Sequence, residues 1–139
     1  MKIFLDTAEP KTIEKHFSTG LIDGVTTNPS LILKAGEKPD DIYQAIKDIG
    51  VKDISMEVSG DASEMLSDAH RLVDKFGDVA TIKLPCTVDG LKVSRKLSRE
   101  LIPTNVTLVF TAAQGLLASK AGAVYVSPFV GRLDDQCVA

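Results

Sequence analysis

The sequence predicts an α/β fold, because short strand-like segments alternate with segments of helical period along the chain. Six segments gather β-branched and apolar residues and then stop at turn or polar residues. Between them, apolar residues recur at helical spacing. The chain has 139 residues, of which 44% are hydrophobic and 25% charged, so we expect one globular domain over residues 1–139.

The predicted strands are mostly apolar on both faces, which is typical of a parallel sheet that helices cover. They span residues 2–7, 24–29, 53–58, 79–85, 105–110 and 123–128.

Five helices are predicted in the intervals between strands. One starts near Pro10, a residue that suits a first helical turn, and the others span 42–49, 65–76, 88–99 and 112–120. A glycine follows the second and third of these helices, as is common at helix C-termini.

Two residue pairs mark helix starts. Asp61 with Glu64, and Thr111 with Gln114, have the spacing of a capping box ahead of an apolar face. Strand and helix therefore alternate with a repeat of roughly 20 to 30 residues, which fits either a doubly wound sheet or a (β/α) barrel.

The turn after the first strand favours the barrel. A dinucleotide-binding doubly wound sheet carries a glycine-rich turn there, whereas residues 6–10 contain no glycine. A barrel enzyme instead places its chemistry at the C-terminal ends of successive strands.

Composition excludes several classes of partner and site. With 16 basic and 19 acidic residues scattered along the chain, no cationic stripe is present, and we expect no nucleic acid partner. Two cysteines and two histidines provide no disulfide framework and no clustered metal ligands. No signal segment and no apolar run long enough to cross a bilayer is found, so we expect a cytoplasmic protein with no membrane partner.

Nearly all the predicted strands end in polar or ionisable residues. Taken singly, each could be a turn former, a helix cap or a solvated charge, and Asn28 in particular could begin a loop and cap the next helix. The residues at these ends are Asp6, Thr27, Asn28, Glu57, Lys83, Asn105, Thr107, Ser127 and Phe129.

Lys83 differs from the other strand-end residues because it lies in a strand with no other charge. It could be a lysine that reaches solvent at the barrel mouth. Alternatively, desolvation favours the neutral amine, which can attack a carbonyl and form a Schiff base. Asp6 and Glu57, from the first and third strands, would be its proton-transfer partners.

Six stretches, in order along the chain, resemble the transaldolase family, specifically the short subfamily that also contains fructose-6-phosphate aldolase. They are FLDTA, GVTTNPSL, the strand of Glu57, IKLPCTVDGL, NVTLVFTAAQ and VSPFVGRLDD. The resemblance implies a (β/α)8 TIM barrel, of which about six β/α units are present here. On this basis we expect the chain to be truncated after its sixth strand, or to be completed by association with another chain. Acting alone, it should be poorly soluble or oligomeric, and its transaldolase activity should be weak or absent.

The resemblance also implies a role for each site residue. Lys83 would form the covalent ketose intermediate, Asp6 would act as general acid and base, and Glu57 with Thr107 would hold a water that shuttles protons. The substrate-binding residues would be Thr27, Asn28, Asn105, Ser127, Phe129 and Arg132. Among these, Arg132 would bind the sugar phosphate, although a surface arginine paired with Asp134 or Asp135 is an alternative.

The function implied is a transaldolase that needs no metal or organic cofactor. It would move a dihydroxyacetone unit from fructose 6-phosphate or sedoheptulose 7-phosphate to an aldose phosphate, as a homo-oligomer. Glu57 and Phe129 stand where the aldolase branch has glutamine and tyrosine, which favours transfer over release of dihydroxyacetone. The alternatives are such an aldolase, or a non-catalytic fragment that serves only in assembly.

Overall fold

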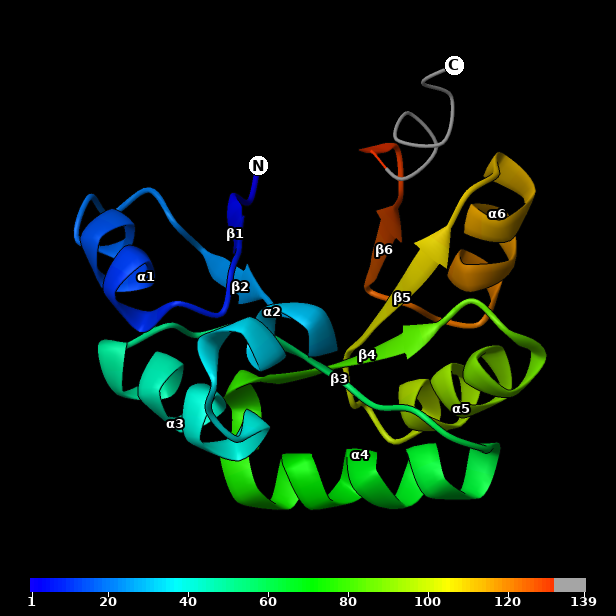
Figure 1. Ribbon diagram of the computed structural model, residues 1–139. Helices are drawn as coiled ribbons and strands as arrows, with labels where there is room; N and C mark the ends of the chain where they lie inside the picture. The colour runs from blue at the N-terminus through cyan, green and yellow to red at the C-terminus, as the bar shows by residue number, and fades with distance from the viewer. Residues whose placement is uncertain (132–139) are drawn as a thin grey trace. The chain divides into compact units, whose positions relative to one another are not determined.

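The computed structural model describes residues 1–131, in which strands and helices alternate along the chain (Figure 1). The predicted α/β fold is confirmed, and the six strands are consistent with part of a TIM barrel. In chain order the elements are β1 (Phe4–Asp6), α1 (Pro10–Phe17), β2 (Gly24–Thr26), α2 (Pro29–Ala35), α3 (Pro39–Ile49), β3 (Ile54–Glu57), α4 (Ala62–Phe76), a 3₁₀ turn (Gly77–Val79), β4 (Ala80–Pro85), α5 (Val88–Arg99), β5 (Thr104–Val109), α6 (Ala112–Lys120) and β6 (Tyr125–Pro128).

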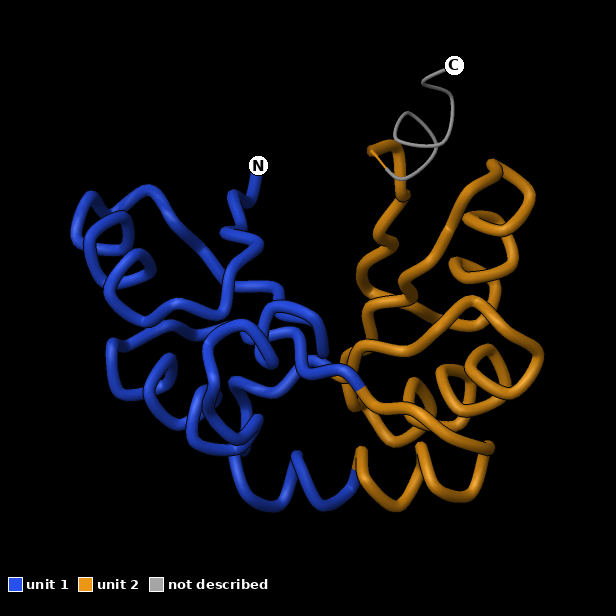
Figure 2. The backbone as a smooth tube through the Cα atoms, viewed as in Figure 1, with its two compact units in different colours: residues 1–57, 70–81 blue, residues 58–69, 82–139 orange. Residues whose placement is uncertain are grey.

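The chain forms two compact units (Figure 2). Of the described residues, unit 1 contains 1–57 and 70–81, and unit 2 contains 58–69 and 82–131. Whether residues 1–139 fold as one domain stays a prediction.

In unit 1, parallel strands β1, β2 and β3 lie in chain order. Asp6 pairs with Thr26, and Thr26 pairs with Ser55, so these three side chains share one face of the sheet. Val25 pairs with Ile54 on the opposite face, and both are fully buried. One face of this sheet is therefore polar and the other belongs to the apolar core.

In unit 2, parallel strands β4, β5 and β6 also lie in chain order. Lys83 pairs with Asn105, which pairs in turn with Tyr125. Behind them, Val106, Val109 and Ala118 form a buried apolar cluster. The sheet again has one face that carries polar groups and one face that packs against helices.

Strand β5 is irregular near its end. The register against β6 shifts between Val106 and Val109. Within that interval Leu108 has a φ of 59°, in the left-handed region that a leucine rarely adopts. A bulge of this kind changes the direction of the side chains that follow it, and bulges are frequent beside functional sites.

Both predicted capping boxes are confirmed. The carboxylate of Glu64 accepts from the backbone N–H of Asp61 at 2.9 Å, and Oδ1 of Asp61 accepts from the N–H of Glu64 at 2.9 Å. The side chains of Thr111 and Gln114 make the same reciprocal exchange at the start of α6. Helices α5 and α6 have the bounds that their sequence pattern predicts.

Helix α2 is the one α-helix of residues 1–131 that the sequence analysis does not predict, and the 3₁₀ turn at Gly77–Val79 is also unpredicted. Helix α2 has seven residues, too few for a helical period to become visible. Its start is nevertheless signalled by Asn28 followed by Pro29. Among residues 1–131, every helix is too short or too polar to traverse a bilayer.

Candidate functional site

The polar face of unit 1 carries Asp6 at the end of β1. The hydroxyl of Thr26, on the neighbouring strand, donates to Oδ1 of Asp6 at 2.9 Å. Asp6 is exposed, so its carboxylate is accessible to a ligand. Glu57 ends β3 two residues after Ser55, and alternation along the strand directs its side chain toward this same face. Unit 1 therefore presents two carboxylates at the ends of its strands.

Thr27, unlike Thr26, does not contribute to this face. It is fully buried, and its hydroxyl donates to the carbonyl oxygen of Ser55 at 3.1 Å. Substrate binding by Thr27 stays a prediction, but Thr26 is the threonine that contacts Asp6. Sequence reasoning missed Thr26 because the choice between adjacent threonines depends on the register between β1 and β2.

Asn28 has the capping role that its sequence context suggests. Its Oδ1 accepts from the backbone N–H of Leu31 at 2.9 Å, at the first turn of α2. This bond uses the side-chain oxygen only, so the amide N–H groups remain chemically suited to a substrate hydroxyl. The predicted contact with substrate stays a prediction.

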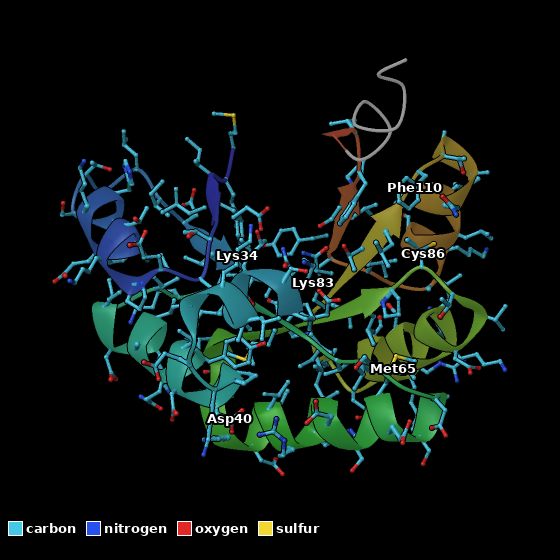
Figure 3. All side chains as sticks on the ribbon, in the orientation of Figure 1. Lys34, Asp40, Met65, Lys83, Cys86 and Phe110 are labelled. Carbon is cyan, nitrogen blue, oxygen red and sulfur yellow. The ribbon has the colours of Figure 1, made fainter. Side chains whose placement is uncertain are left out.

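Lys83 lies in the middle of β4 in unit 2 and is labelled in Figure 3. It is 4% exposed, between Ile82 and Leu84, which are fully buried. Its carbonyl oxygen accepts from the N–H of Val58 at 3.1 Å, which anchors the backbone at this point. The sequence singles out Lys83 because its strand carries no other charge. In the structure this side chain is almost entirely removed from solvent.

Asn105 and Ser127 lie on the same face as Lys83. The strand register places Asn105 directly beside Lys83, and Ser127 follows Asn105's partner Tyr125 by two residues. Ser127 Oγ donates to Oδ1 of Asn105 at 2.8 Å. The structure therefore brings together two of the predicted substrate-binding side chains, beside the predicted nucleophile.

Thr107 also shares this face, because it lies two residues beyond Asn105 on β5. It is 1% exposed, and its hydroxyl has no hydrogen-bond partner among the described residues. A buried polar group left without a partner costs about 1–3 kcal/mol, so such a hydroxyl is suited to binding a ligand or a water. This observation fits the predicted role of Thr107 in holding water.

Phe129 follows β6, and its N–H donates to the carbonyl oxygen of Val109 at 2.8 Å. Its ring meets that of Phe110 edge to face, with centroids 5.7 Å apart. Phe110, labelled in Figure 3, directly follows β5. It is 40% exposed. The two aromatic rings therefore form an apolar border at this end of the sheet. Arg132 lies outside the described residues.

Tyr43, on α3 in unit 1, is a residue that sequence reasoning missed. In the sequence it is simply one of the residues within an amphipathic helix. The structure buries it to 2% exposure and sets its ring edge to face against that of Phe76, with centroids 5.8 Å apart. Burial raises the pKa of the Tyr43 phenol above its ordinary value. No sequence signal identifies the ring contact, because it depends on how α3 packs against the end of α4.

The chemistry available on these faces suits a polyhydroxylated carbonyl compound. Unit 2 offers an amine from Lys83, an amide from Asn105, and the hydroxyls of Thr107 and Ser127. An amine can add to a carbonyl, and the other groups can hydrogen-bond hydroxyls. Among residues 1–131, His, Cys, Asp and Glu side chains do not gather in groups of three or more that could hold a metal ion.

A family model described as transaldolase/fructose-6-phosphate aldolase matches residues 3–139. Curated relatives are similar over 97% of this chain. A protein named "Probable transaldolase" from Nitrosopumilus maritimus is 53% identical over 136 residues. Another of that name from Geobacter sulfurreducens is 54% identical over 136 residues. These alignments cover 61% and 63% of the relatives, so the chain spans about three fifths of their length.

Solved structures show the same fold at low sequence identity. The carboxyl transferase domain of Rhizobium etli pyruvate carboxylase, solved with oxamate and biotin, has a TM-score of 0.60 and 16% identity. The match covers 99% of this chain and 30% of that one. The same domain solved with 3-bromopyruvate has a TM-score of 0.57 and the same identity and coverage. At this level of identity the likeness concerns the fold alone.

Proposed function

Because the chain belongs to the transaldolase/fructose-6-phosphate aldolase family, we propose that it carries the Schiff-base chemistry of a transaldolase. The reaction moves a dihydroxyacetone unit from fructose 6-phosphate or sedoheptulose 7-phosphate to an aldose phosphate acceptor. The observation that supports this most directly is the burial of Lys83, at 4% exposure, on a face shared with Asn105, Thr107 and Ser127.

Lys83 is the proposed nucleophile. Its neutral amine adds to the ketose carbonyl, and loss of water gives a protonated imine. When the carbon–carbon bond next to the dihydroxyacetone unit breaks, the imine accepts the electron pair. The aldehyde product leaves, and the three-carbon unit stays on Lys83 until an acceptor aldehyde arrives. The position of Lys83 supports this role, because the side chain is 4% exposed and lies on the face of the sheet that Asn105 shares.

Asp6 is the proposed general acid and base for carbon–carbon cleavage. It takes the proton from the hydroxyl that becomes the aldehyde and returns it in the reverse step. The hydrogen bond from Thr26 supports this role, because it fixes the orientation of the Asp6 carboxylate. Glu57 and Thr107 are proposed to hold the water that enters and leaves during imine hydrolysis and formation.

Hydrogen bonds with Asn28, Asn105 and Ser127 are proposed to hold the hydroxyls of the dihydroxyacetone unit, with the Ser127 oxygen as an acceptor because its hydroxyl donates to Asn105. Phe129 would border the site, and Arg132 would bind the sugar phosphate through its planar guanidinium. The wider proposal, which includes Thr27 as a substrate-binding residue, is a cytoplasmic homo-oligomer in which no cofactor takes part.

Release of free dihydroxyacetone is the second candidate reaction. Phenylalanine at position 129 provides no hydroxyl to protonate the three-carbon carbanion or to position water, and this favours transfer. A third possibility is that the chain serves only in assembly, since it spans about three fifths of the length of its relatives.

An assay with fructose 6-phosphate, with and without erythrose 4-phosphate, separates these functions. We expect aldehyde release to continue only when the acceptor is present, and to be lost in Lys83→Arg, because a guanidinium does not deprotonate. Phe129→Tyr should raise dihydroxyacetone release relative to transfer. Equal turnover without acceptor would favour the aldolase, and no turnover with the folded chain would favour the assembly role.

A further inference from the structure

The geometry points to Leu108 as a positioning residue, whose left-handed backbone makes Thr107 the last side chain of β5 on the face that carries Lys83. The inference rests on the proposed function, in which Thr107 holds the water that takes part in imine formation and hydrolysis. Leu108 itself is assigned no contact with the substrate.

The direction of the backbone carbonyl groups along β5 changes at Leu108. In a regular strand, residues two apart direct their carbonyl groups toward the same neighbouring strand. The carbonyl oxygen of Thr107 accepts from the N–H of Cys86, just after β4, at 2.9 Å. The carbonyl oxygen of Val109 instead accepts from the N–H of Phe129, just after β6, at 2.8 Å. The regular alternation is therefore broken between Thr107 and Val109.

The side chains of β5 show the same break. Three steps along β5, from Val106 to Val109, correspond to two steps along β6, from Val126 to Pro128. Side chains three apart on a regular strand point to opposite faces, yet Val106 and Val109 both enter the buried apolar cluster. Leu108 is thus the extra residue of a β-bulge.

This bulge keeps an apolar side chain away from the site. Without the extra residue, Val109 would lie on the polar face two positions beyond Thr107 and would cover the end of that face. With it, Val109 lies in the core at 3% exposure. The buried Thr107 hydroxyl, which has no hydrogen-bond partner within residues 1–131, is then left for a water or a ligand.

Leucine is an unfavourable residue for this backbone. Within residues 1–131, Leu108 and Leu101 are the only residues other than glycine that have a positive φ. Glycine adopts such a conformation freely and asparagine at little cost, whereas β-branched residues adopt it least readily. Strained residues persist where the surrounding structure imposes the conformation, and they cluster at functional sites. Here the hydrogen bonds of Thr107 to one neighbouring strand and of Val109 to the other impose it.

The test uses three substitutions that separate backbone preference from side-chain packing. Leu108→Gly and Leu108→Asn accept the left-handed backbone but remove the half-buried apolar side chain. Leu108→Ile keeps the volume of that side chain and disfavours the backbone. If Leu108 only packed, isoleucine would be the mildest of the three changes, but if it positions Thr107, isoleucine is the most harmful.

Leu101→Ile is the matched control. It introduces the same residue at a φ of 62°, in a side chain that follows α5 and is 91% exposed. Three quantities are measured on the 139-residue chain. They are the amide proton chemical shift of Phe129, which reports its hydrogen bond to Val109, the rate and half-saturation of borohydride trapping with fructose 6-phosphate, and the urea midpoint of unfolding.

We expect Leu108→Ile to move the Phe129 amide proton upfield and to slow trapping at saturating substrate about tenfold, with half-saturation changed less than about twofold. Leu108→Gly and Leu108→Asn should keep the amide shift, and a trapping rate within about twofold of wild type. Leu101→Ile should lower the urea midpoint, as Leu108→Ile does, and leave the amide shift and the trapping rate unchanged.

A double variant shows whether Leu108 acts through Thr107. In a Thr107→Val background the hydroxyl is already absent, so Leu108→Ile should slow trapping less than about twofold further. A tenfold loss there, a wild-type rate in Leu108→Ile, or equal losses in all three Leu108 variants would overturn the inference and leave the proposed function intact. If the wild-type chain is not trapped at all, the proposed function fails, and this inference fails with it.

Discussion

The hydroxyl of Ser127 donates a 2.8 Å hydrogen bond to Oδ1 of Asn105, and this bond sets the direction of a side-chain amide that is 98% buried. With its oxygen turned toward β6, Asn105 directs its N–H groups elsewhere on the face it shares with Lys83. The hydrogen bond between Ser127 and Asn105 thus orients the Asn105 amide N–H groups as donors beside Lys83, the proposed nucleophile.

Ser127→Ala should weaken binding of fructose 6-phosphate about three- to tenfold. The physical reason is that the Asn105 amide loses the partner that orients it, which is worth about 1 kcal/mol for a neutral hydrogen bond. Calorimetric titration of the Lys83→Arg variant, which binds without reacting, measures the effect with and without Ser127→Ala. Unchanged affinity in the double variant would show that the Ser127–Asn105 pair does not orient substrate.

Thr26→Val should mainly slow carbon–carbon cleavage, whereas Thr27→Val should mainly lower the free energy of unfolding. Thr26→Val removes the donor to exposed Asp6, so we expect carbon–carbon cleavage to slow about ten- to hundredfold with little loss of stability. Thr27→Val removes a fully buried hydroxyl bonded to Ser55, so we expect unfolding free energy to fall about 1–3 kcal/mol. Single-turnover cleavage and urea unfolding measure the two effects. Similar cleavage rates in both variants would contradict the assignment of Thr26 to Asp6.

Much of this arrangement could be predicted from the sequence, because strand and helix patterns are local. Capping boxes, the bounds of α5 and α6, and the burial of Lys83 follow from residue type and spacing. What could not be predicted depends on contacts between segments. The register of Asp6 with Thr26 decides which threonine faces the site. The packing of α3 against the end of α4 decides that Tyr43 meets Phe76.

Leu101→Gly should stabilise the protein by about 0.5–1 kcal/mol. Leu101 follows α5 with a φ of 62°, and its side chain is 91% exposed, so it gains little from burial. Glycine relieves a left-handed strain of about 1–2 kcal/mol, partly offset by its greater freedom in the unfolded chain. Urea unfolding measures the change, with Leu101→Ala as the control that keeps a Cβ. Equal stability of the glycine and alanine variants would contradict this explanation.

Asp40→Asn should destabilise the protein at neutral pH and have no effect in acid. Lys75 donates to Asp40 at 2.7 Å and Arg71 at 2.9 Å. The bond from Lys75 lowers the pKa of Asp40 below its ordinary value, partial burial opposes this, and Arg71 lowers it again.

A lowered pKa in the folded state stabilises the fold above the ordinary pKa of about 4, and this stabilisation is lost as the pH falls through the folded value. We expect Asp40→Asn to cost about 0.5–1 kcal/mol at pH 7, because the pairs are partly exposed. The cost should vanish as the pH falls through the folded-state pKa of Asp40. Asp41→Asn, in the same helical turn, is the control. A cost that does not change with pH in chemical unfolding would contradict the role of these ion pairs.

The central claim is that Lys83 forms the imine, and borohydride reduction with fructose 6-phosphate tests it most directly. Mass spectrometry of the digested chain should find a single modified lysine, Lys83, and Lys83→Arg should abolish the modification. A reduced adduct on any other lysine, or no adduct on a folded chain that binds the sugar phosphate, would contradict the account.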